Sequence, residues 1–277
     1  MTRTWLVTGS SRGFGRALCE AILDVGDNLL ATARDPDQLA GLGDGRPGKL
    51  ATARLDVTSE EDAIAAVATA ITTFGALDIL VNNAGYGDIG SVEDTPIDSF
   101  RRQIDTNLFG TILMTKAVIP HMRERRRGHI VQFSSVGGRV GAPGRAPYSA
   151  AKWGVEGFSE VLAQEMKLIG VRVTIVEPGG FRTDFAGSST TLDTGRAEYD
   201  AVVGNAARMQ AAYHGQQPGD PRRGAQAILA IVADDDSPLR LPLGSDAVAA
   251  IERGDKARLA ELERWRALSV STDFPKE

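Results

Sequence analysis

The sequence predicts an α/β fold, in which a doubly wound, seven-stranded parallel sheet carries helices on both faces. Short runs rich in leucine and β-branched residues alternate with longer segments of helical period almost to the end of the chain. A glycine-rich loop joins the first such run to the first helical segment. The chain has 277 residues, 42% of them hydrophobic, which is enough for one large core. Because crossovers between parallel strands are right-handed, this alternation places helices on both faces of the sheet.

The strand pattern recurs seven times, near residues 3–8, 28–33, 50–55, 78–82, 129–134, 171–177 and 239–243. Helical segments lie between these runs, near residues 14–25, 59–74, 97–126, 148–169 and 222–233. In such sheets ligands bind at the carboxyl ends of the strands, so functional residues are expected there.

Two later segments interrupt the alternation. Residues 183–218 are rich in glycine, serine and threonine and then become helical, which is typical of a lid over a binding site. Residues 246–268 are charged and have a helical period, which predicts a C-terminal helix. No linker divides the chain, so we expect a single domain over residues 1–277.

Composition excludes several classes of function. A net charge of −5 argues against nucleic-acid binding, which needs a basic surface, and the basic run at residues 123–127 is interpreted as a solvated helix end. No apolar run approaches the roughly 18–20 residues that span a bilayer, and no leader pattern precedes the first strand, so we expect a cytoplasmic protein without membrane contact.

Neither cysteine nor histidine predicts a metal or disulfide site. Cys19 is the single cysteine and is expected to be a buried apolar residue of the first helix. His121, His129 and His214 are scattered without ligand spacing, so no metal is expected. The first two are interpreted as structural, whereas His214 lies in the predicted lid, where substrate contact is the alternative.

The glycine-rich loop has the composition of a dinucleotide-binding turn. Glycines there let the backbone turn sharply and approach a pyrophosphate, and the following helix offers free N–H groups and a positive dipole end. An ordinary tight turn is the alternative for such a loop taken alone. The loop residues expected to contact a cofactor are Gly9, Ser11, Arg12, Gly13, Phe14 and Gly15.

The end of the second strand favours NADP over NAD. Dehydrogenases that prefer NAD usually carry an acidic residue there, which binds the adenosine ribose. Ala33 occupies that place, Arg34 follows it, and Arg12 is expected to reach the same corner. Two guanidinium groups suit a 2′-phosphate. NADP(H) is therefore the expected cofactor, and NAD(H) is the less favoured one. Two alternatives remain: the two arginines could be surface residues that bind no ligand, or Asp35 could select NAD.

Tyr148 and Lys152 have the spacing that puts two side chains on one face of a helix. Taken alone, such a pair is common and usually structural. An ammonium group beside a phenol lowers the phenol pKa from about 10, which allows proton exchange near neutrality. Ser135 follows the strand near 129–134, where its hydroxyl would meet a substrate oxygen. Ser134 would point to the other side and is interpreted as structural or supporting.

Taken together, these motifs resemble those of the short-chain dehydrogenases/reductases of the single-domain type, which have a Rossmann fold. The resemblance runs from the first strand to about residue 185, with the motifs in the family's order and spacing. Besides the glycine loop, the matching residues are Asp56, Val57, Asn82, Asn83, Ala84, Gly85, Asn107, Ser135, Tyr148, Lys152 and the segment from Pro178 and Gly179 to Thr183.

The resemblance implies a role for each of four catalytic residues. Tyr148 would exchange a proton with the substrate oxygen, which Ser135 would hold and polarise. Lys152 would lower the Tyr148 pKa and bind the nicotinamide ribose, and Asn107 would bind a water that links Lys152 to solvent. Hydride would pass between the cofactor and a carbonyl or alcohol. Cofactor contacts are implied for Arg34, Asp56, Val57, Asn83, Ala84, Gly85, Tyr148, Lys152, Pro178, Gly179 and Thr183, in addition to the loop.

The segments 82–87 and 177–183 are similar to the branch that includes 17β-hydroxysteroid and retinol dehydrogenases, which implies a bulky, apolar carbonyl or alcohol substrate. Specificity is expected from residues 86–92, residues 137–147 and the lid. Apolar lid residues suited to line the pocket, or alternatively to pack the lid down, are Phe185, Tyr199, Met209 and Tyr213.

Two other functions remain as alternatives at this point. A catalytically silent NADP-binding regulator is disfavoured because all four catalytic residue types are present. A sugar-nucleotide epimerase or dehydratase is disfavoured because such relatives generally carry a longer C-terminal domain. The resemblance also implies a homo-dimer or homo-tetramer formed through the helices near 97–126 and 148–169.

Overall fold

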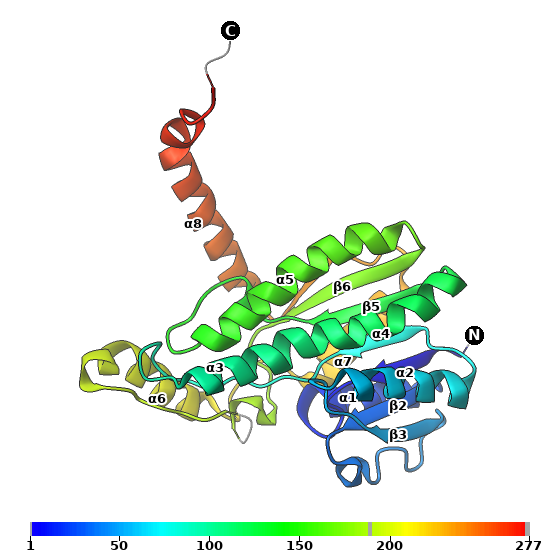
Figure 1. Ribbon diagram of the computed structural model, residues 1–277. Coiled ribbons are helices and arrows are strands. Elements are labelled where there is room, and N and C mark those ends of the chain that lie inside the picture. Colours follow the sequence, from blue (N-terminus) through cyan, green and yellow to red (C-terminus); the bar gives the residue numbers. More distant parts are fainter. Residues whose placement is uncertain (1, 188–189, 275–277) are drawn as a thin grey trace.

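The computed structural model describes residues 2–187 and 190–274, and its centre is a single parallel sheet of seven strands (Figure 1). The strand order is β3-β2-β1-β4-β5-β6-β7, and every neighbouring pair is parallel, which confirms the predicted doubly wound fold. The strands are β1 (Thr4–Val7), β2 (Asn28–Ala33), β3 (Leu50–Arg54), β4 (Ile79–Asn82), β5 (Gly128–Phe133), β6 (Val171–Pro178) and β7 (Arg240–Leu243).

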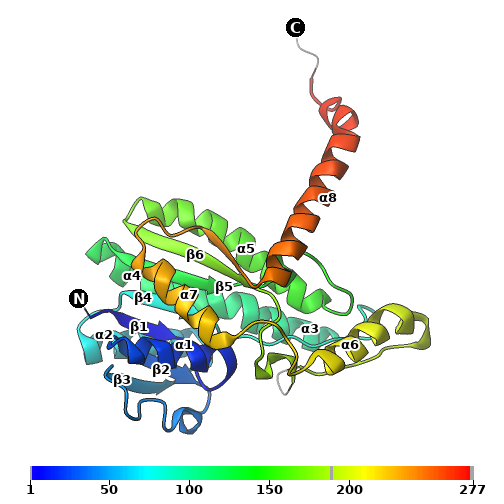
Figure 2. The same ribbon diagram turned by 180° about the vertical axis from the view of Figure 1, so that it is seen from behind.

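Helices cover both faces of this sheet. Figure 2 shows α1 (Gly13–Asp24) and α7 (Pro221–Ala233) side by side on one face. The other face carries α2 (Glu60–Phe74), α4 (Gly110–Arg125) and α5 (Ala146–Lys167).

Two hydrophobic clusters result, one on each side of the sheet. In β1, Trp5 and Val7 contribute to the cluster under α1 and α7, whereas Leu6 contributes to the opposite cluster. Successive side chains of a strand point to opposite faces, so a strand covered on both sides is apolar throughout. For this reason the sequences of the central strands are continuous apolar runs.

The helix expected near 97–126 is interrupted. It consists of α3 (Ile97–Ile104), a π-helical turn (Asp105–Phe109) and α4. No glycine or proline occurs within residues 97–109, so no local signal predicts an interruption of the helix there. The helix expected from residue 148 begins at Ala146, with Pro147 in its first turn, where a missing N–H costs little.

The segment that follows β6 contains short helical turns and α6 (Asn205–Tyr213). It is attached to the loop after β4, because Ile89 N–H donates to Thr191 O at 2.9 Å and Asp193 N–H donates to Ile89 O at 2.9 Å. These bonds hold the segment over the carboxyl edge of the sheet.

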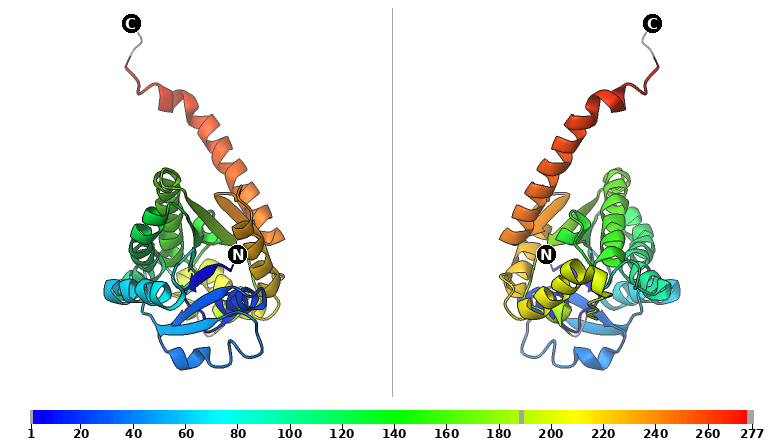
Figure 3. Two further views of the ribbon diagram at one scale, coloured as in Figure 1. Left: turned by 90° about the vertical axis from the view of Figure 1, so that its right-hand side faces the viewer. Right: turned by 90° about the vertical axis from the view of Figure 1, so that its left-hand side faces the viewer.

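The chain ends in α8 (Ser245–Val270), which projects away from the body (Figures 1 and 3). Its first turns are anchored by the buried side chains of Ala247 and Ile251. Within the described residues, none of the helices is long and apolar enough to cross a membrane.

Candidate active site

The sheet brings the sequence motifs together at its carboxyl edge. The loops after β1, β2 and β4 line a groove of about 900 Å³, and those after β5 and β6 line a smaller cavity of about 280 Å³. The strand order reverses between β1 and β4, and this is where doubly wound sheets bind ligands. Residues common to both cavities are Phe14, Asn83, Gly85, Thr183 and Phe185.

The glycine loop has a shape that other residues would not permit. Gly9 and Gly13 have φ angles of 68° and 58°, and a Cβ atom on Gly15 would lie 2.2 Å from Gly9 O. Asn83 Nδ2 fixes the loop by donating to Thr8 O at 2.9 Å and Gly9 O at 3.1 Å. The bare backbone at the start of α1 fits the close approach of a pyrophosphate.

The structure places the predicted cofactor residues along these two cavities. Those that line the larger groove are Gly9, Ser11, Arg12, Gly13, Phe14, Gly15, Arg34, Asp56, Val57, Asn83, Ala84, Gly85 and Thr183. Those that line the smaller cavity include Tyr148, Lys152, Pro178 and Gly179.

Arg34 and Asp35 have different surroundings at the end of β2. The pKa of Asp56 is lowered by hydrogen bonds from Thr58 and, to a smaller extent, by the positive charge of Arg34, so Arg34 acts on this end of the groove. Asp35 accepts hydrogen bonds from Asp37 N–H at 3.2 Å and from Gln38 Nε2 at 3.4 Å. Its carboxylate is therefore engaged in capping the short helix that follows β2.

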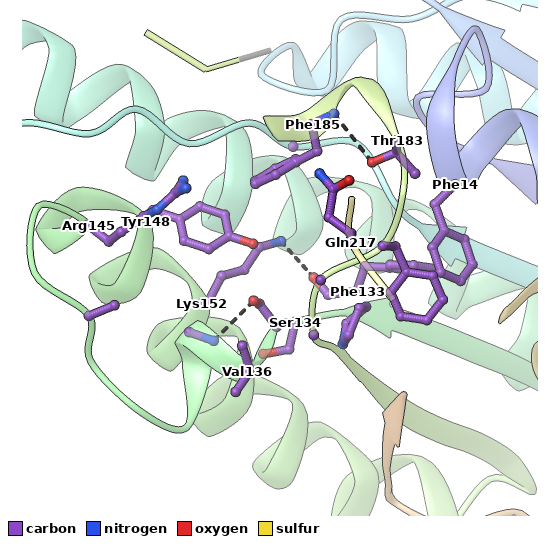
Figure 4. Close-up of a pocket in the computed structure, with 18 of the residues that line it drawn as sticks. Phe14, Phe133, Ser134, Val136, Arg145, Tyr148, Lys152, Thr183, Phe185 and Gln217 are labelled. Atoms are coloured by element: carbon purple, nitrogen blue, oxygen red, sulfur yellow. Dashed lines mark hydrogen bonds between the residues drawn. The ribbon is translucent and has the colours of Figure 1, made fainter. Parts of the chain in front are cut away.

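Ser135, Tyr148 and Lys152 line the smaller cavity together. Figure 4 shows Tyr148 and Lys152 next to each other in this cavity. Lys152 Nζ donates to Phe133 O at 2.7 Å and lies 5.8 Å from the centroid of the Tyr148 ring. Ser135 Oγ accepts from Gly137 N–H at 3.0 Å. A Cβ atom on Gly137 would lie 3.3 Å from the Tyr148 ring and 3.5 Å from Ser135 Oγ, so glycine lets these two side chains approach each other.

Burial has the largest effect on the pKa values of Tyr148 and Lys152. It raises the pKa of Tyr148, against the opposing effects of a hydrogen bond from Ser135 and the charge of Arg145. It also lowers the pKa of Lys152 to about 8, against the opposing charge of Glu156. The Tyr148 pKa is thus raised rather than lowered as expected, because desolvation of the phenolate outweighs the Ser135 hydrogen bond and the charge of Arg145.

Asn107 lies in the π-helical turn, with its side chain bonded to neighbouring backbone. Its Nδ2 donates to Tyr86 O at 2.9 Å and Gln103 O at 2.8 Å, and its Oδ1 accepts from Tyr86 N–H at 3.2 Å. A Cβ atom on Gly85 would lie 2.5 Å from Asn107 Oδ1 and 3.6 Å from Lys152 Nζ. The bare Gly85 backbone therefore lies between Asn107 and Lys152.

The sequence did not single out three residues around the cavity, although two of them lie in segments expected to set specificity, 137–147 and the lid. Arg145 donates from Nη1 to Gly87 O at 3.1 Å, and its guanidinium carbon is 5.9 Å from the Tyr148 ring centroid. Gln217 enters the cavity from the segment after α6, and Asp246 of α8 accepts from Gly180 N–H at 2.7 Å. No local motif marks these residues, since tertiary folding alone brings them to the site.

The smaller cavity is more apolar than polar, but its lining differs from the prediction. Phe185 and Tyr213 line it, and the Phe185 ring lies 5.6 Å from that of Tyr148. Met209 is 63% exposed on the outer side of α6, and the Tyr199 hydroxyl donates to Glu93 at 2.7 Å, so neither lines the cavity.

The loop after β4 is one of the segments expected to set specificity. Tyr86 and Asp88 line the larger groove rather than the smaller cavity. A Cβ atom on Gly87 would lie 2.7 Å from the Tyr148 ring. This loop therefore packs against the ring of Tyr148.

The histidines take no part in the cluster. His129 is buried against Thr174 Oγ1 at 2.9 Å, and burial lowers its pKa to about 3. His121 Nε2 accepts from Leu77 N–H at 3.1 Å, so both are structural, as expected. His214 is exposed and lies outside the cavity lining. Among the described residues, no group of histidine, cysteine and carboxylate side chains is arranged to hold a metal.

Comparison with known proteins agrees with this geometry. The family model for short chain dehydrogenase matches residues 3–193. Oxidoreductase BOA17 of Botryotinia fuckeliana (strain B05.10) is 43% identical over 274 residues, covering 98% of this chain and 100% of the relative. A 3-ketodihydrosphingosine reductase of Bacteroides thetaiotaomicron is 34% identical over 240 residues, or 86% of this chain and 87% of the relative.

A solved structure is also close to this one. The crystal structure of a short-chain dehydrogenase from Streptomyces avermitilis superimposes with a TM-score of 0.91 at 37% identity, covering 98% of both chains. A family model that matches most of the chain and relatives that span nearly all of it agree with the fold and with the gathered motifs. The chain belongs to the short-chain dehydrogenase/reductase family of oxidoreductases.

Proposed function

We propose that this oxidoreductase uses NADP(H) to interconvert a ketone or aldehyde and the corresponding alcohol, with the whole chain acting as one catalytic domain. The observation that carries the proposal is the convergence of Ser135, Tyr148 and Lys152 in a cavity that joins the dinucleotide groove. The residues from 183 to 218 would act as the substrate lid.

The choice of NADP rests on the corner formed by β2 and the glycine loop. Arg12 and Arg34 both line the groove there, and two guanidinium groups suit a phosphate dianion. Ala33 leaves no carboxylate at the end of β2, and Asp35 already accepts hydrogen bonds within the following turn. This corner therefore favours binding of a ribose 2′-phosphate over binding of a ribose 2′-hydroxyl.

The cavity residues suit proton transfer to a substrate oxygen. When bound, the nicotinamide supplies hydride to the carbonyl carbon. Tyr148 would donate its phenolic proton to the carbonyl oxygen, and its raised pKa keeps the phenol protonated beforehand. Ser135 donates a hydrogen bond to the same oxygen and stabilises the charge that develops on it.

Lys152 and Asn107 would support this step. Lys152 is fixed by Phe133 O, and its remaining N–H groups would bind the nicotinamide ribose. Asn107, on the other side of Gly85, would hold a water that carries protons from solvent towards Lys152.

A bulky, apolar substrate fits the lining of the smaller cavity. Phe185 and Tyr213 form its lid side, and Val136 and Ala142 lie among its other walls. The name of the Bacteroides relative, a 3-ketodihydrosphingosine reductase, agrees with reduction of a keto group.

We further propose that the enzyme is a homo-dimer or homo-tetramer. Trp153 and Val161 of α5, and Leu168 directly after it, are 45%, 56% and 77% exposed, and a second copy that covers this helix would remove apolar surface from water. Sedimentation analysis would test this, and a monomeric mass would contradict it.

The function is tested by following NADPH and, separately, NADH consumption with steroid, retinoid, aromatic and aliphatic carbonyls. We expect turnover with NADPH on bulky apolar ketones. Binding of NADPH without turnover of any carbonyl would instead favour a regulatory role, and a preference for NADH would contradict the cofactor assignment.

A further inference from the structure

Gln217 is a buried amide without a partner. Its side chain is 2% exposed, and within the described part of the chain neither Nε2 nor Oε1 has a hydrogen-bond partner. Figure 4 shows the side chain directed into the smaller cavity, in the neighbourhood of Thr183 and Lys152. Buried amides are normally paired, because an unpaired one loses its hydrogen bonds to water without replacement.

The backbone of Gln217 is firmly attached to the segment after β6. Gln217 O accepts from Arg182 Nε at 3.3 Å and from Arg182 Nη2 at 3.0 Å. Two residues later, Gly219 N–H donates to Gly180 O and Gly219 O accepts from Arg182 N–H, both at 2.9 Å. The backbone that carries the amide is thus held beside the segment 180–182, so the position of Gln217 is set by the fold.

The surroundings of Gln217 indicate which ligand group would pair with it. Thr183, Phe14 and Asn83 line the smaller cavity together with Gln217, and all three also line the dinucleotide groove. A primary carboxamide offers both an acceptor and donors, so it can pair with Gln217 through two hydrogen bonds. A ketone oxygen, in contrast, accepts only, and would leave Gln217 Oε1 unpaired.

We propose that the Gln217 side chain binds the carboxamide of the nicotinamide ring. Nε2 donates to the carboxamide oxygen, and Oε1 accepts from the carboxamide N–H. The pairing would fix the rotation of the ring next to Tyr148 and supply the partners that the buried amide lacks. This inference rests on the proposed function, since it requires a nicotinamide dinucleotide in the groove.

The test compares two probes by isothermal titration calorimetry, without turnover. NADP⁺ carries the nicotinamide ring, and 2′-phospho-ADP-ribose is the same molecule without it. Loss of two hydrogen bonds should weaken NADP⁺ binding to Gln217→Leu by about 5- to 30-fold, while binding of the fragment stays within about 2-fold. The exposed neighbour provides the matched control, and Gln216→Leu should bind both probes like the wild type.

A cofactor analogue sharpens the assignment. In 3-acetylpyridine adenine dinucleotide phosphate a methyl ketone replaces the amide, so the N–H donor is lost. Wild-type protein should bind the analogue more weakly than NADP⁺, and Gln217→Leu should show a smaller difference, because the two changes remove the same contact. Gln217→Met serves the same purpose if thermal melting shows that the leucine variant is unfolded.

The results that overturn the proposal are distinct from those that overturn the function. Wild-type affinity of Gln217→Leu for NADP⁺, or an equal loss for both probes, would reject the nicotinamide contact alone. Failure of the wild type to bind either NADP⁺ or NAD⁺ would reject the proposed function as well. If NAD⁺ is the tighter ligand, NAD⁺ and ADP-ribose form the equivalent pair of probes.

Discussion

The carboxylate of Asp246, in the first turn of α8, accepts a hydrogen bond of 2.7 Å from the backbone N–H of Gly180. A Cβ atom on Gly179 would lie 2.4 Å from the same carboxylate. The C-terminal helix therefore braces the segment after β6, which lines the cavity. A side chain 66 residues away in the sequence thus helps to shape the site.

Asp246→Ala should weaken the structure and the site together. Removal of the carboxylate leaves Gly180 N–H without its partner, at a cost of about 1–3 kcal/mol in the free energy of unfolding. We expect a lower melting temperature and weaker NADP⁺ binding. Calorimetry and thermal melting check this, with the exposed Glu261→Gln of the same helix as control. An unchanged melting temperature and NADP⁺ affinity for Asp246→Ala would mean that this contact contributes neither to stability nor to cofactor binding.

Tyr148→Phe should remove the proton donor and leave the cofactor site intact. We expect kcat to fall by roughly 10²–10⁴-fold, the usual effect of lost acid–base catalysis. The affinity for NADPH should change little, because the ring still fills its place between Gly87 and Gly137. Steady-state kinetics and NADPH titration separate the two effects. Tyr199→Phe, outside the cavity, is the control, and near-normal turnover of Tyr148→Phe would remove Tyr148 from its proposed role.

How much the sequence predicts depends on whether the signal is local. The glycine loop and the Tyr148–Lys152 pair are set by spacing within one turn or one helix, so the sequence located them. Arg145 and Gln217 reach the cavity only through the fold of loops, and no period or motif marks them. The pKa of Tyr148 is a further case, since desolvation depends on the whole surroundings of the phenol and sequence spacing reveals only its charged neighbour.

Prediction from local sequence signals is limited in the same way for the lid. Its apolar residues were visible in the sequence, but only the structure separates Tyr213, on the inner side of α6, from Met209, on the outer side. A short helix with weak amphipathic pattern does not reveal which side faces the protein.

Arg34→Asp should shift the preference of the enzyme from NADPH towards NADH. The change removes a cation from the end of β2 and adds a carboxylate that repels a 2′-phosphate and accepts hydrogen bonds from a ribose hydroxyl. The ratio of kcat/KM for the two cofactors measures the effect. Arg223→Asp, whose side chain is 91% exposed on α7, controls for the change in net charge. An unchanged ratio for Arg34→Asp would place the ribose contact elsewhere.

Lys152→Met should abolish activity and yet stabilise the protein near neutral pH. Burial lowers the Lys152 pKa from 10.5 to about 8 in the folded protein, so folding penalises the charged form. The folded state binds fewer protons than the unfolded state between these values, so wild-type stability rises with pH from about 8 towards 10.5. Below pH 8 the full penalty applies, at most ~3 kcal/mol.

Urea unfolding of the two proteins between pH 7 and pH 10 checks this pH dependence. The stability gained by Lys152→Met should be largest at pH 7 and should shrink as the pH rises, because the wild-type lysine loses its charge in the folded protein first. The exposed Lys167→Met of the same helix should show no such trend. A stability difference independent of pH would mean that Lys152 carries no burial penalty, and its hydrogen bond to Phe133 O would then offset desolvation entirely.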